Sequence, residues 1–282
     1  MPVINTNVNA LFSQNALKTN SRTLSTAMEQ LSTGSRINSA KDDAAGLAIS
    51  NIMTSNIRGL NQAVRNANDG INLAQTAEGA MIEQTNMLQR MRELAVQAST
   101  ATYAGTQRDY LDLEFQALNT QIDNIAKQTT WNGEAILQGD KGNAGDGIYK
   151  IIVTSENAAT MALTSINFKI DNVQSAELLG AGAVDIKTAD KATAAITTID
   201  GALTKLNTAR AKLGAGINQL TYAADNLTNV VQNTTTSRSQ IMDTDYATAT
   251  TKLASSQIIA QAATAMLAQA NQSQQSVLAL LK

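Results

Sequence analysis

Residues 196–231 read ITTIDGALTKLNTARAKLGAGINQLTYAADNLTNVV, and the spacing of their apolar residues predicts one long helix. Its apolar positions recur in alternating steps of three and four residues. They are Ile196, Ile199, Leu203, Leu206, Arg210, Leu213, Ile217, Leu220, Ala224, Leu227 and Val231, with Arg210 the one charged member. A repeat of 3.5 residues is the seam of a coiled coil. At 1.5 Å per residue, a helix over 190–237 would be roughly 70 Å long and needs an equally long partner.

Two further stretches with helical spacing can supply that partner. The first is Ile57, Leu60, Val64, Ala67, Ile71 and Ala74, and the second is Leu111, Phe115, Leu118, Ile122 and Ile125. From Ile217 to Lys282 there is neither glycine nor proline to interrupt a helix. The sequence therefore predicts a mainly α fold, a long antiparallel coiled-coil-like rod built from both ends of the chain.

The middle of the chain has a different character. GIYKIIVTSE (147–156) and MALTSINFKID (161–171) are rich in β-branched and aromatic residues, with the turn-like NAAT between them. This pattern predicts a small β-hairpin. An insert of about 50 residues is expected to decorate the rod and to be separable from it.

Composition excludes several classes of function. The chain has 282 residues, no cysteine, no histidine and 3% aromatic residues, so the usual nucleophiles, general bases and soft metal ligands are missing. We expect no enzyme activity, no cofactor and no metal. A net charge of −2 gives no field that would attract nucleic acid. No apolar run of about 20 residues and no secretory signal are present, so we expect no membrane insertion.

The two chain ends carry few charges and regularly spaced apolar residues. Leu253 to Leu281 contains no charged residue. A helix of this kind is marginal alone in water, so we expect its apolar stripe to be buried between subunits. The expected interface positions are Val3, Leu17, Leu24, Met28 and Leu31 at one end and Ile259, Ala263, Met266, Ala270, Val277 and Leu280 at the other.

Seven motifs in order resemble the bacterial flagellin family. They are RINSAKDDAAGLAIS (36–50), NANDG (66–70), LQRMRELAVQ (88–97), WNG (131–133), KLGAGINQL (212–220), SQIMDTDYA (239–247) and AQANQSQQSVLALLK (268–282). The resemblance covers 1–138 and 190–282. It departs from the family pattern at Ala249, where a glutamate is usual, and at Gln274, where a proline is usual.

The resemblance implies a division of the chain and a function. It implies an inner-core helix and joint over 1–42, an outer-core rod over 43–138 and 190–240, a short variable insert over 139–189 and an inner-core helix over 241–282. It also implies a homopolymer that forms the extracellular flagellar filament for swimming, exported unfolded through the flagellar type III pathway. The implied partners are the export apparatus, a flagellin chaperone, the filament cap and the hook-associated proteins.

One motif has a second implied role. A Toll-like receptor of animal hosts senses flagellins, and by resemblance Gln89, Arg90 and Leu94 fall on the recognised surface, with Glu114 beside it. Arg90 and Leu94 are one helical step apart, which favours a shared face. The competing interpretation, which we favour as the primary role, is that this face packs against a neighbouring subunit.

Several motifs have simpler interpretations than chemistry. The acidic pairs Asp42–Asp43 and Asp243–Asp245 are expected to cap helices or form turns and not to bind metal. Gly214 and Gly216 are expected to allow close helix packing and not to form a phosphate loop. The methionines at 81, 87 and 91 are expected to fill a core.

Three alternatives to a filament subunit remain. A hook–filament junction protein with flagellin-like ends would be distinguished by its location. A helical signalling hairpin predicts membrane segments, and an enzyme predicts a nucleophile–base or metal constellation, neither of which the sequence shows.

Overall fold

The computed structural model describes residues 6–140, 142, 145–153, 165–180 and 184–280, with the side chains of 274–280 excepted. It divides into two compact units, one formed by Met1–Ser55 with Asn233–Lys282 and the other by Asn56–Gln232. The helices are α1 (Val8–Thr33), α2 (Ala44–Ser99), α3 (Gly105–Gln128), α4 (Ser175–Leu178), α5 (Ala189–Met242) and α6 (Tyr246–Leu280). The strands are β1 (Thr130–Trp131), β2 (Glu134–Ala135), β3 (Ile148–Ile152) and β4 (Ser165–Lys169).

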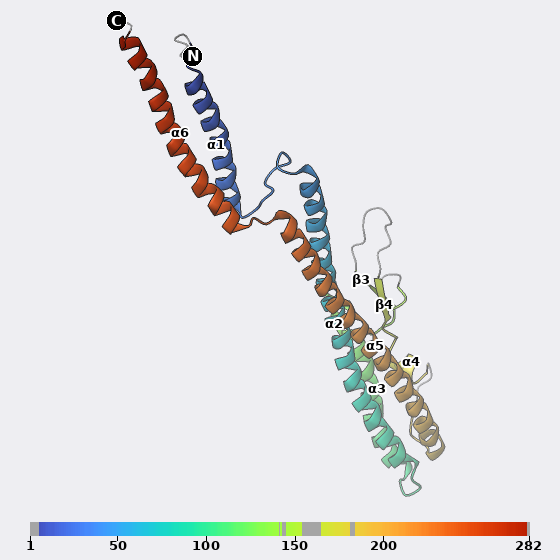
Figure 1. Ribbon diagram of the computed structural model, residues 1–282. Coiled ribbons are helices and arrows are strands. Elements are labelled where there is room, and N and C mark those ends of the chain that lie inside the picture. The colour runs from blue at the N-terminus through green and yellow to red at the C-terminus, as the bar shows by residue number, and fades with distance from the viewer. Residues whose placement is uncertain (1–5, 141, 143–144, 154–164, 181–183, 281–282) are drawn as a thin grey trace. The chain divides into compact units, whose positions relative to one another are not determined.

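Helices α2 and α5 form an antiparallel pair, as the seam predicted (Figure 1). Arg92 Nε lies 2.7 Å from Asp200 Oδ1, and Arg210 Nη2 lies 3.7 Å from Glu78 Oε1. Residue numbers therefore rise along α2 as they fall along α5. Every seventh residue of the α5 seam is buried, namely Ile199, Leu206, Leu213, Leu220 and Leu227. This heptad burial confirms the coiled-coil-like rod.

Helix α3 packs onto the same core, since Phe115 and Ile122 are fully buried beside residues of α2. Met81 and Met91 are also fully buried, and Met87 packs against the core. The prediction that these methionines fill a core is confirmed. Flexible thioethers suit the irregular space where three helices meet.

The middle segment forms the predicted hairpin. Strands β3 and β4 pair antiparallel with Ile148 opposite Lys169 and Ile152 opposite Ser165. The Tyr149 and Phe168 rings stack across the pair with centroids 5.7 Å apart. Within the described residues the strands leave out Gly147 and Val153 at one side and Ile170 and Asp171 at the other, and the predicted residues 154–164, with the NAAT segment, lie outside the described residues.

A second hairpin, β1–β2, was not predicted and follows α3 directly. Thr130 pairs with Ala135 and Trp131 with Glu134. The two turn residues, Asn132 and Gly133, have φ angles of 51° and 82°. An Asn-Gly pair with both φ angles positive is the preferred two-residue hairpin turn. Here the WNG motif has a clear structural reason.

The insert is part of the core, which contradicts the expectation that it merely decorates the rod. Its apolar side chains belong to the same buried cluster as those of α2, α3 and α5. The buried members are Ile166, Phe168, Ile170, Val173, Leu178, Leu179 and Ile186. On α5, a Cβ added at Gly216 would lie 3.2 Å from Phe168 Cβ, so glycine there admits β4. Gly216 therefore allows close packing of α5, but against strand β4 and not against another helix, whereas an added Cβ at Gly214 would contact nothing within 4 Å.

Four side chains of α2 and α3 hold the main chain of the insert. Gln84 Nε2 donates to the Val173 carbonyl at 3.1 Å, and Gln116 Nε2 donates to the Val184 carbonyl at 2.8 Å. The Ser175 N–H donates to Asp123 at 2.7 Å, and the Ile186 N–H donates to Asp112 at 3.0 Å. We call these four side chains the insert tethers. Gln84 and Asp112 are buried and each has a further contact, since Gln84 Nε2 also donates to the Ile122 carbonyl at 3.2 Å and Asp112 lies 3.8 Å from Lys187 Nζ.

Candidate self-assembly surface

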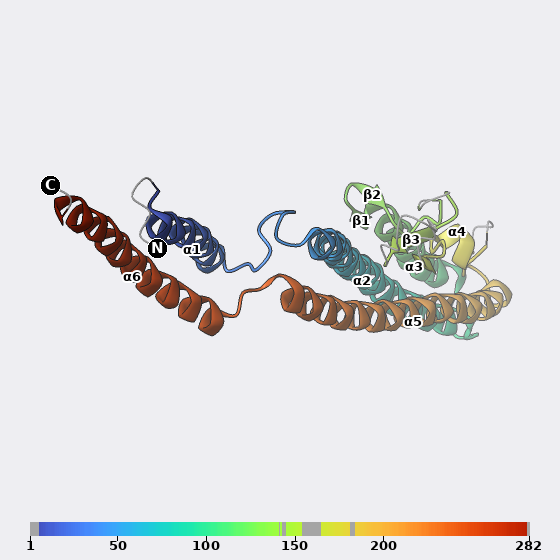
Figure 2. The same ribbon diagram turned by 45° about the horizontal axis from the view of Figure 1, so that its top comes forward.

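Helices α1 and α6 lie side by side along their length (Figures 1 and 2). The Asn7 side chain begins α1 by accepting a hydrogen bond from the Ala10 N–H at 3.0 Å, and it donates to the Ala270 carbonyl of α6 at 3.2 Å. Gly34 ends α1 in the left-handed conformation at φ 71°, the usual glycine cap. The C-terminal helix, uncharged from Leu253 onward, therefore has a partner within its own chain, contrary to the expectation that only other subunits could cover it.

The seam of this pair is made of small residues and leucines. Ala27 and Ala249 are almost completely buried, and the buried Asn20 donates to the carbonyl of the buried Ser256 at 2.7 Å. Five predicted interface residues lie half-buried on these two helices. They are Leu17, Leu24, Leu31, Ala263 and Ala270.

A second set of apolar side chains on the two helices is exposed. Phe12 is 77% exposed, Ile258 66% and Met266 62%. The set consists of Val8, Leu11, Phe12 and Met28 on α1 and Ile258, Ile259 and Met266 on α6. Three of the predicted interface residues, Met28, Ile259 and Met266, therefore lie open on the surface. We call this set the exposed apolar face.

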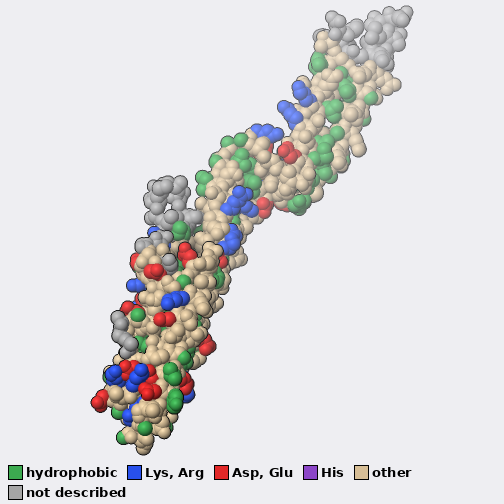
Figure 3. Space-filling model, turned by 180° about the vertical axis from the view of Figure 1, so that it is seen from behind, with side chains coloured by type: hydrophobic (Ala, Val, Ile, Leu, Met, Phe, Trp, Pro, Cys, Tyr) green, Lys and Arg blue, Asp and Glu red, His purple; other side chains and the backbone are tan. Residues whose placement is uncertain are grey.

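Part of the exposed apolar face borders a groove of about 650 Å³ between α1 and α6. Phe12 and Ile259 line it together with small and hydroxyl side chains such as Ala16 and Thr19. Figure 3 shows hydrophobic side chains along the terminal helices, with most charged side chains of that view on the other unit. Large apolar side chains left exposed in this number favour a protein–protein contact.

Three of the predicted interface positions cannot be compared with the described side chains. Val3 lies outside the described residues, and Val277 and Leu280 lie in α6 where side chains are not described. Sequence reasoning missed Phe12, Leu11 and Ile258. The signal available was the phenylalanine itself, one of three in the chain and placed within a polar, charge-poor helix.

The acidic motifs cap helices, as predicted. Asp43 accepts a hydrogen bond from the Gly46 N–H at 2.9 Å at the start of α2. Asp245 does the same for α6, accepting from the N–H groups of Ala247 and Thr248. The Thr248 hydroxyl also donates to Asp245, and these hydrogen bonds lower the pKa of that carboxyl. Asp42 accepts from Ser39 and its pKa is lowered in the same way.

The proposed receptor residues divide between surface and core. Gln89 and Arg90 are exposed, and Arg90 Nη2 lies 2.9 Å from Glu114 Oε1 on the exposed side of α3. This ion pair raises the pKa of Arg90. Leu94 is only 1% exposed and packs in the core, so its assignment to that surface is wrong. The reason is that i and i+4 differ by about 40° around a helix, enough to cross from a solvent face to a buried one.

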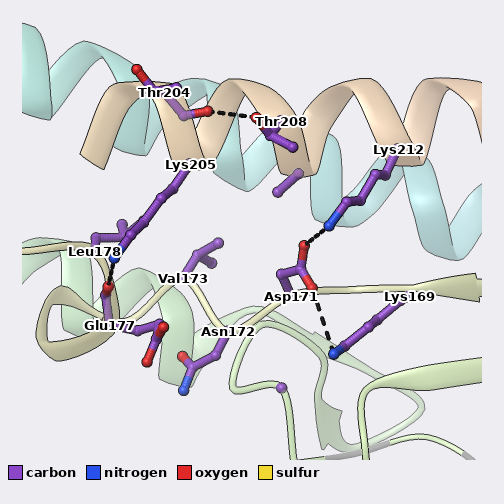
Figure 4. A pocket seen from close by; sticks show the side chains of 12 residues that line it. Lys169, Asp171, Asn172, Val173, Glu177, Leu178, Thr204, Lys205, Thr208 and Lys212 are labelled. Carbon is purple, nitrogen blue, oxygen red and sulfur yellow. Dashed lines mark hydrogen bonds and ion pairs between the residues drawn. The ribbon is translucent and has the colours of Figure 1, made fainter. Parts of the chain in front are cut away.

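A second hollow, of about 460 Å³, lies between α5 and the insert (Figure 4). Its basic side chains already have partners. Lys212 Nζ lies 2.7 Å from Asp171, Lys169 Nζ lies 3.8 Å from the same carboxylate, and Lys205 donates to the Glu177 carbonyl at 2.7 Å. These contacts fasten the insert to α5 and leave no unpaired cation for an anionic ligand among the lining lysines.

Within the described part of the chain, no group of three or more acidic residues could hold a metal ion. Over the same residues, no helix has the length and apolarity to cross a membrane.

Long paired helices in both units, with exposed apolar residues on the α1–α6 pair, are the features of a self-assembling structural subunit. Family models for the bacterial flagellin N-terminal and C-terminal helical regions match residues 4–142 and 196–281. The chain belongs to the bacterial flagellin family and is a flagellar filament subunit.

Named relatives agree with this. The chain is 38% identical to the flagellar filament 33 kDa core protein of Treponema phagedenis over 294 residues, covering 99% of this chain and all of that one. It is 34% identical to flagellin A of Vibrio cholerae over 378 aligned positions, covering 99% of each. A solved structure from Vibrio parahaemolyticus, provisionally named a flagellar hook-associated protein, has a TM-score of 0.56 at 11% identity. It covers 72% of this chain and all of that one, and it shares the fold alone.

Proposed function

We propose that this subunit is exported unfolded through the flagellar type III pathway and polymerises outside the cell into the propeller for swimming. The observation that carries the proposal is the exposed apolar face of the α1–α6 pair. Burying a side chain such as Phe12 or Met266 contributes about 1.5–3 kcal/mol, and a filament repeats that gain at every subunit. An open helical polymer needs such a face to meet a different face of the next copy.

The test introduces a carboxylate into the exposed apolar face. Met266→Asp and Phe12→Asp should each stop filament growth in seeded assembly, since a buried unpaired carboxylate costs several kcal/mol per subunit. Gln261→Asp, at an exposed polar position of α6, is the matched control and should still polymerise. Electron microscopy measures assembly, and circular dichroism checks that each monomer keeps its helices. Normal filaments from both apolar-face variants would place the assembly contact elsewhere.

The proposed partners are the export apparatus, a flagellin chaperone, the filament cap and the hook-associated proteins. The role of the chain itself is structural, without catalysis. A hook–filament junction protein is the alternative. Antibody labelling of intact flagella distinguishes these two functions. An antibody against a filament subunit would label the whole filament, and one against a junction protein would label only its base.

We further propose that a flagellin-sensing Toll-like receptor contacts Gln89, Arg90 and Glu114. The exposed ion pair between Arg90 and Glu114 supports this, since it presents a fixed pair of charges at the surface. Loss of receptor binding by Glu114→Ala, with no loss by Asp109→Ala on the same helix, is the expected result. Equal binding by both variants would rule the site out.

A further inference from the structure

The register between α1 and α6 is defined by three contacts. Asn20 Nδ2 lies 2.7 Å from the Ser256 carbonyl, Asn7 Nδ2 lies 3.2 Å from the Ala270 carbonyl, and Tyr246 Oη lies 3.4 Å from the Leu31 carbonyl. The two residue numbers of each contact add to 276 or 277 (20 and 256, 7 and 270, 31 and 246). This constant sum is that of a regular antiparallel pair.

The seam itself does not specify this register. On α6, the small residues Ala249, Ser256, Ala263 and Ala270 recur every seven positions, and between them Leu253, Ala260 and Leu267 recur with the same spacing. Sliding α1 by one heptad keeps every small residue opposite the position of another small residue. It replaces the leucine–leucine level of 24 and 253 with two others, 17 with 267 and 31 with 253. Asn20 would then meet Ala263, whose main-chain carbonyl is chemically equivalent to that of Ser256.

Charge does not specify the register either. The charged side chains of the two helices are Lys18, Arg22, Glu29 and Lys252, and within the described residues no ion pair joins α1 to α6. Interhelical charge pairs are a common way to set register and partner. The α2–α5 pair has them, in Arg92–Asp200 and Glu78–Arg210.

Contacts that do depend on register lie at one end of the pair, where the chain leaves α1 and enters α6. Ser35 and Asp243 form an isolated antiparallel β-bridge, and the Thr244 N–H donates to the Gly34 carbonyl at 3.0 Å. Arg36 donates through its main-chain N–H to the Met242 carbonyl and through its guanidinium to the Ile241 carbonyl, both at 2.6 Å. We call residues 34–36 with 241–246 the joint.

We propose that the joint, and not the helix seam, sets the register between α1 and α6. A one-heptad slip moves the helices by about 10 Å at 1.5 Å per residue, which would break every joint contact while leaving the seam packed. The register decides which exposed residues of α1 lie beside which exposed residues of α6. The importance of this register for assembly rests on the proposed function. The inference about the register itself is independent of that function.

The absence of cysteine makes the register measurable by engineered disulfides. Ala27→Cys with Ala249→Cys reports the native register, since both residues are buried at the same level. Ala27→Cys with Ser256→Cys reports the slipped register. A disulfide needs Cα atoms within about 7 Å, so a 10 Å slip allows only one of the two pairs to close. Cross-linking is measured on the full-length chain, both before and after filament assembly.

Two changes then separate the joint from the seam. The seam variant Leu24→Ala favours the slipped register by packing alone, because it removes the leucine–leucine level of 24 and 253 and leaves those of 17 with 267 and 31 with 253. With the joint intact, the native disulfide should remain at least tenfold more abundant than the slipped one. Adding Arg36→Ala and Tyr246→Phe to the seam variant should lower that ratio at least fivefold.

Each other outcome overturns the proposal. A seam variant that alone moves the cross-link to the slipped pair shows that the seam sets the register. A joint variant that stays native shows that the joint does not set it, and failure of both pairs in both states refutes the pairing. If the chain with Ala27→Cys and Ala249→Cys cross-links in the native register while the cysteine-free chain never polymerises, the proposed function fails and the register result stands.

Discussion

The Asp245 carboxylate caps α6, and its ionisation makes the stability of this helix end depend on pH. It accepts hydrogen bonds from the Thr248 hydroxyl and from two N–H groups in the first turn of α6, and these lower its pKa below the ordinary 3.8. A carboxylate near a helix N-terminus also interacts favourably with the helix dipole. Because the folded pKa is depressed, its contribution to stability is present above the unfolded pKa and is lost as the pH falls through the folded pKa.

We therefore expect the first turn of α6 to weaken on acidification below about pH 4. Asp245→Asn should keep the cap, because asparagine is also a good N-cap, but remove the pH dependence at this turn. Nuclear magnetic resonance titration of the Thr248 amide in both chains measures the effect. An identical acid transition in the asparagine variant would assign the titration to another group.

Some properties of single residues were predictable from the sequence and others were not. The caps at Asp43 and Asp245 follow from local chain chemistry and were predictable. The burial of Leu94 beside the exposed Arg90 was not, because a helix spacing of four does not reveal where the boundary of the solvent face lies. The exposure of Phe12 could not be predicted either, since it depends on where α6 packs.

The insert is the element for which sequence and structure differ most. Its hairpin was predictable from β-branched residues, but its place in the core depends on hydrogen bonds between residues distant in sequence. The Ile186 N–H bonded to Asp112 spans 74 residues and the Val173 carbonyl bonded to Gln84 spans 89. No local pattern encodes such pairs. The long helices were predictable because their heptad repeat is itself local.

Replacing residues 141–181 with a Gly/Ser linker should therefore destabilise the rod. The change removes large buried side chains such as Ile170 and Phe168, each worth about 1.5–3 kcal/mol, from a fold whose total stability is about 5–15 kcal/mol. We expect the thermal midpoint followed by circular dichroism to fall by about 10 °C or more. A control that only shortens 154–164 keeps β3 and β4 and should unfold near the wild-type midpoint. An unchanged midpoint in the larger deletion would show that the insert is dispensable to the core.

For the whole molecule, the two compact units differ in what they bury. The unit of residues 56–232 buries large side chains such as Phe115, Leu88 and Ile199, whereas the α1–α6 seam buries mainly alanines and leaves its leucines half-exposed. Local stability follows buried apolar contact. The predicted inner-core and outer-core division of the chain stays a prediction at the level of the filament.

Hydrogen exchange on monomer and filament should show this difference. In the monomer, amides of 8–33 and 246–273 should exchange faster than those of 60–98, and assembly should slow them at least tenfold by covering the exposed apolar face. Mass spectrometry after timed labelling measures both states. Protection of 8–33 equal to that of 60–98 in the free monomer would show that the terminal pair is stable without neighbours.

The insert tethers have a further consequence for how this chain can change over generations. Each tether forms a hydrogen bond with a main-chain group of the insert and not with a particular side chain. The four tethers are Gln84, Asp112, Gln116 and Asp123. Substitutions at solvent-facing positions of the insert therefore leave these hydrogen bonds intact, while a substitution at any of the four tethers loses one or more of them. Sequence diversity can accumulate in the insert, and purifying selection should be concentrated on the four tethers.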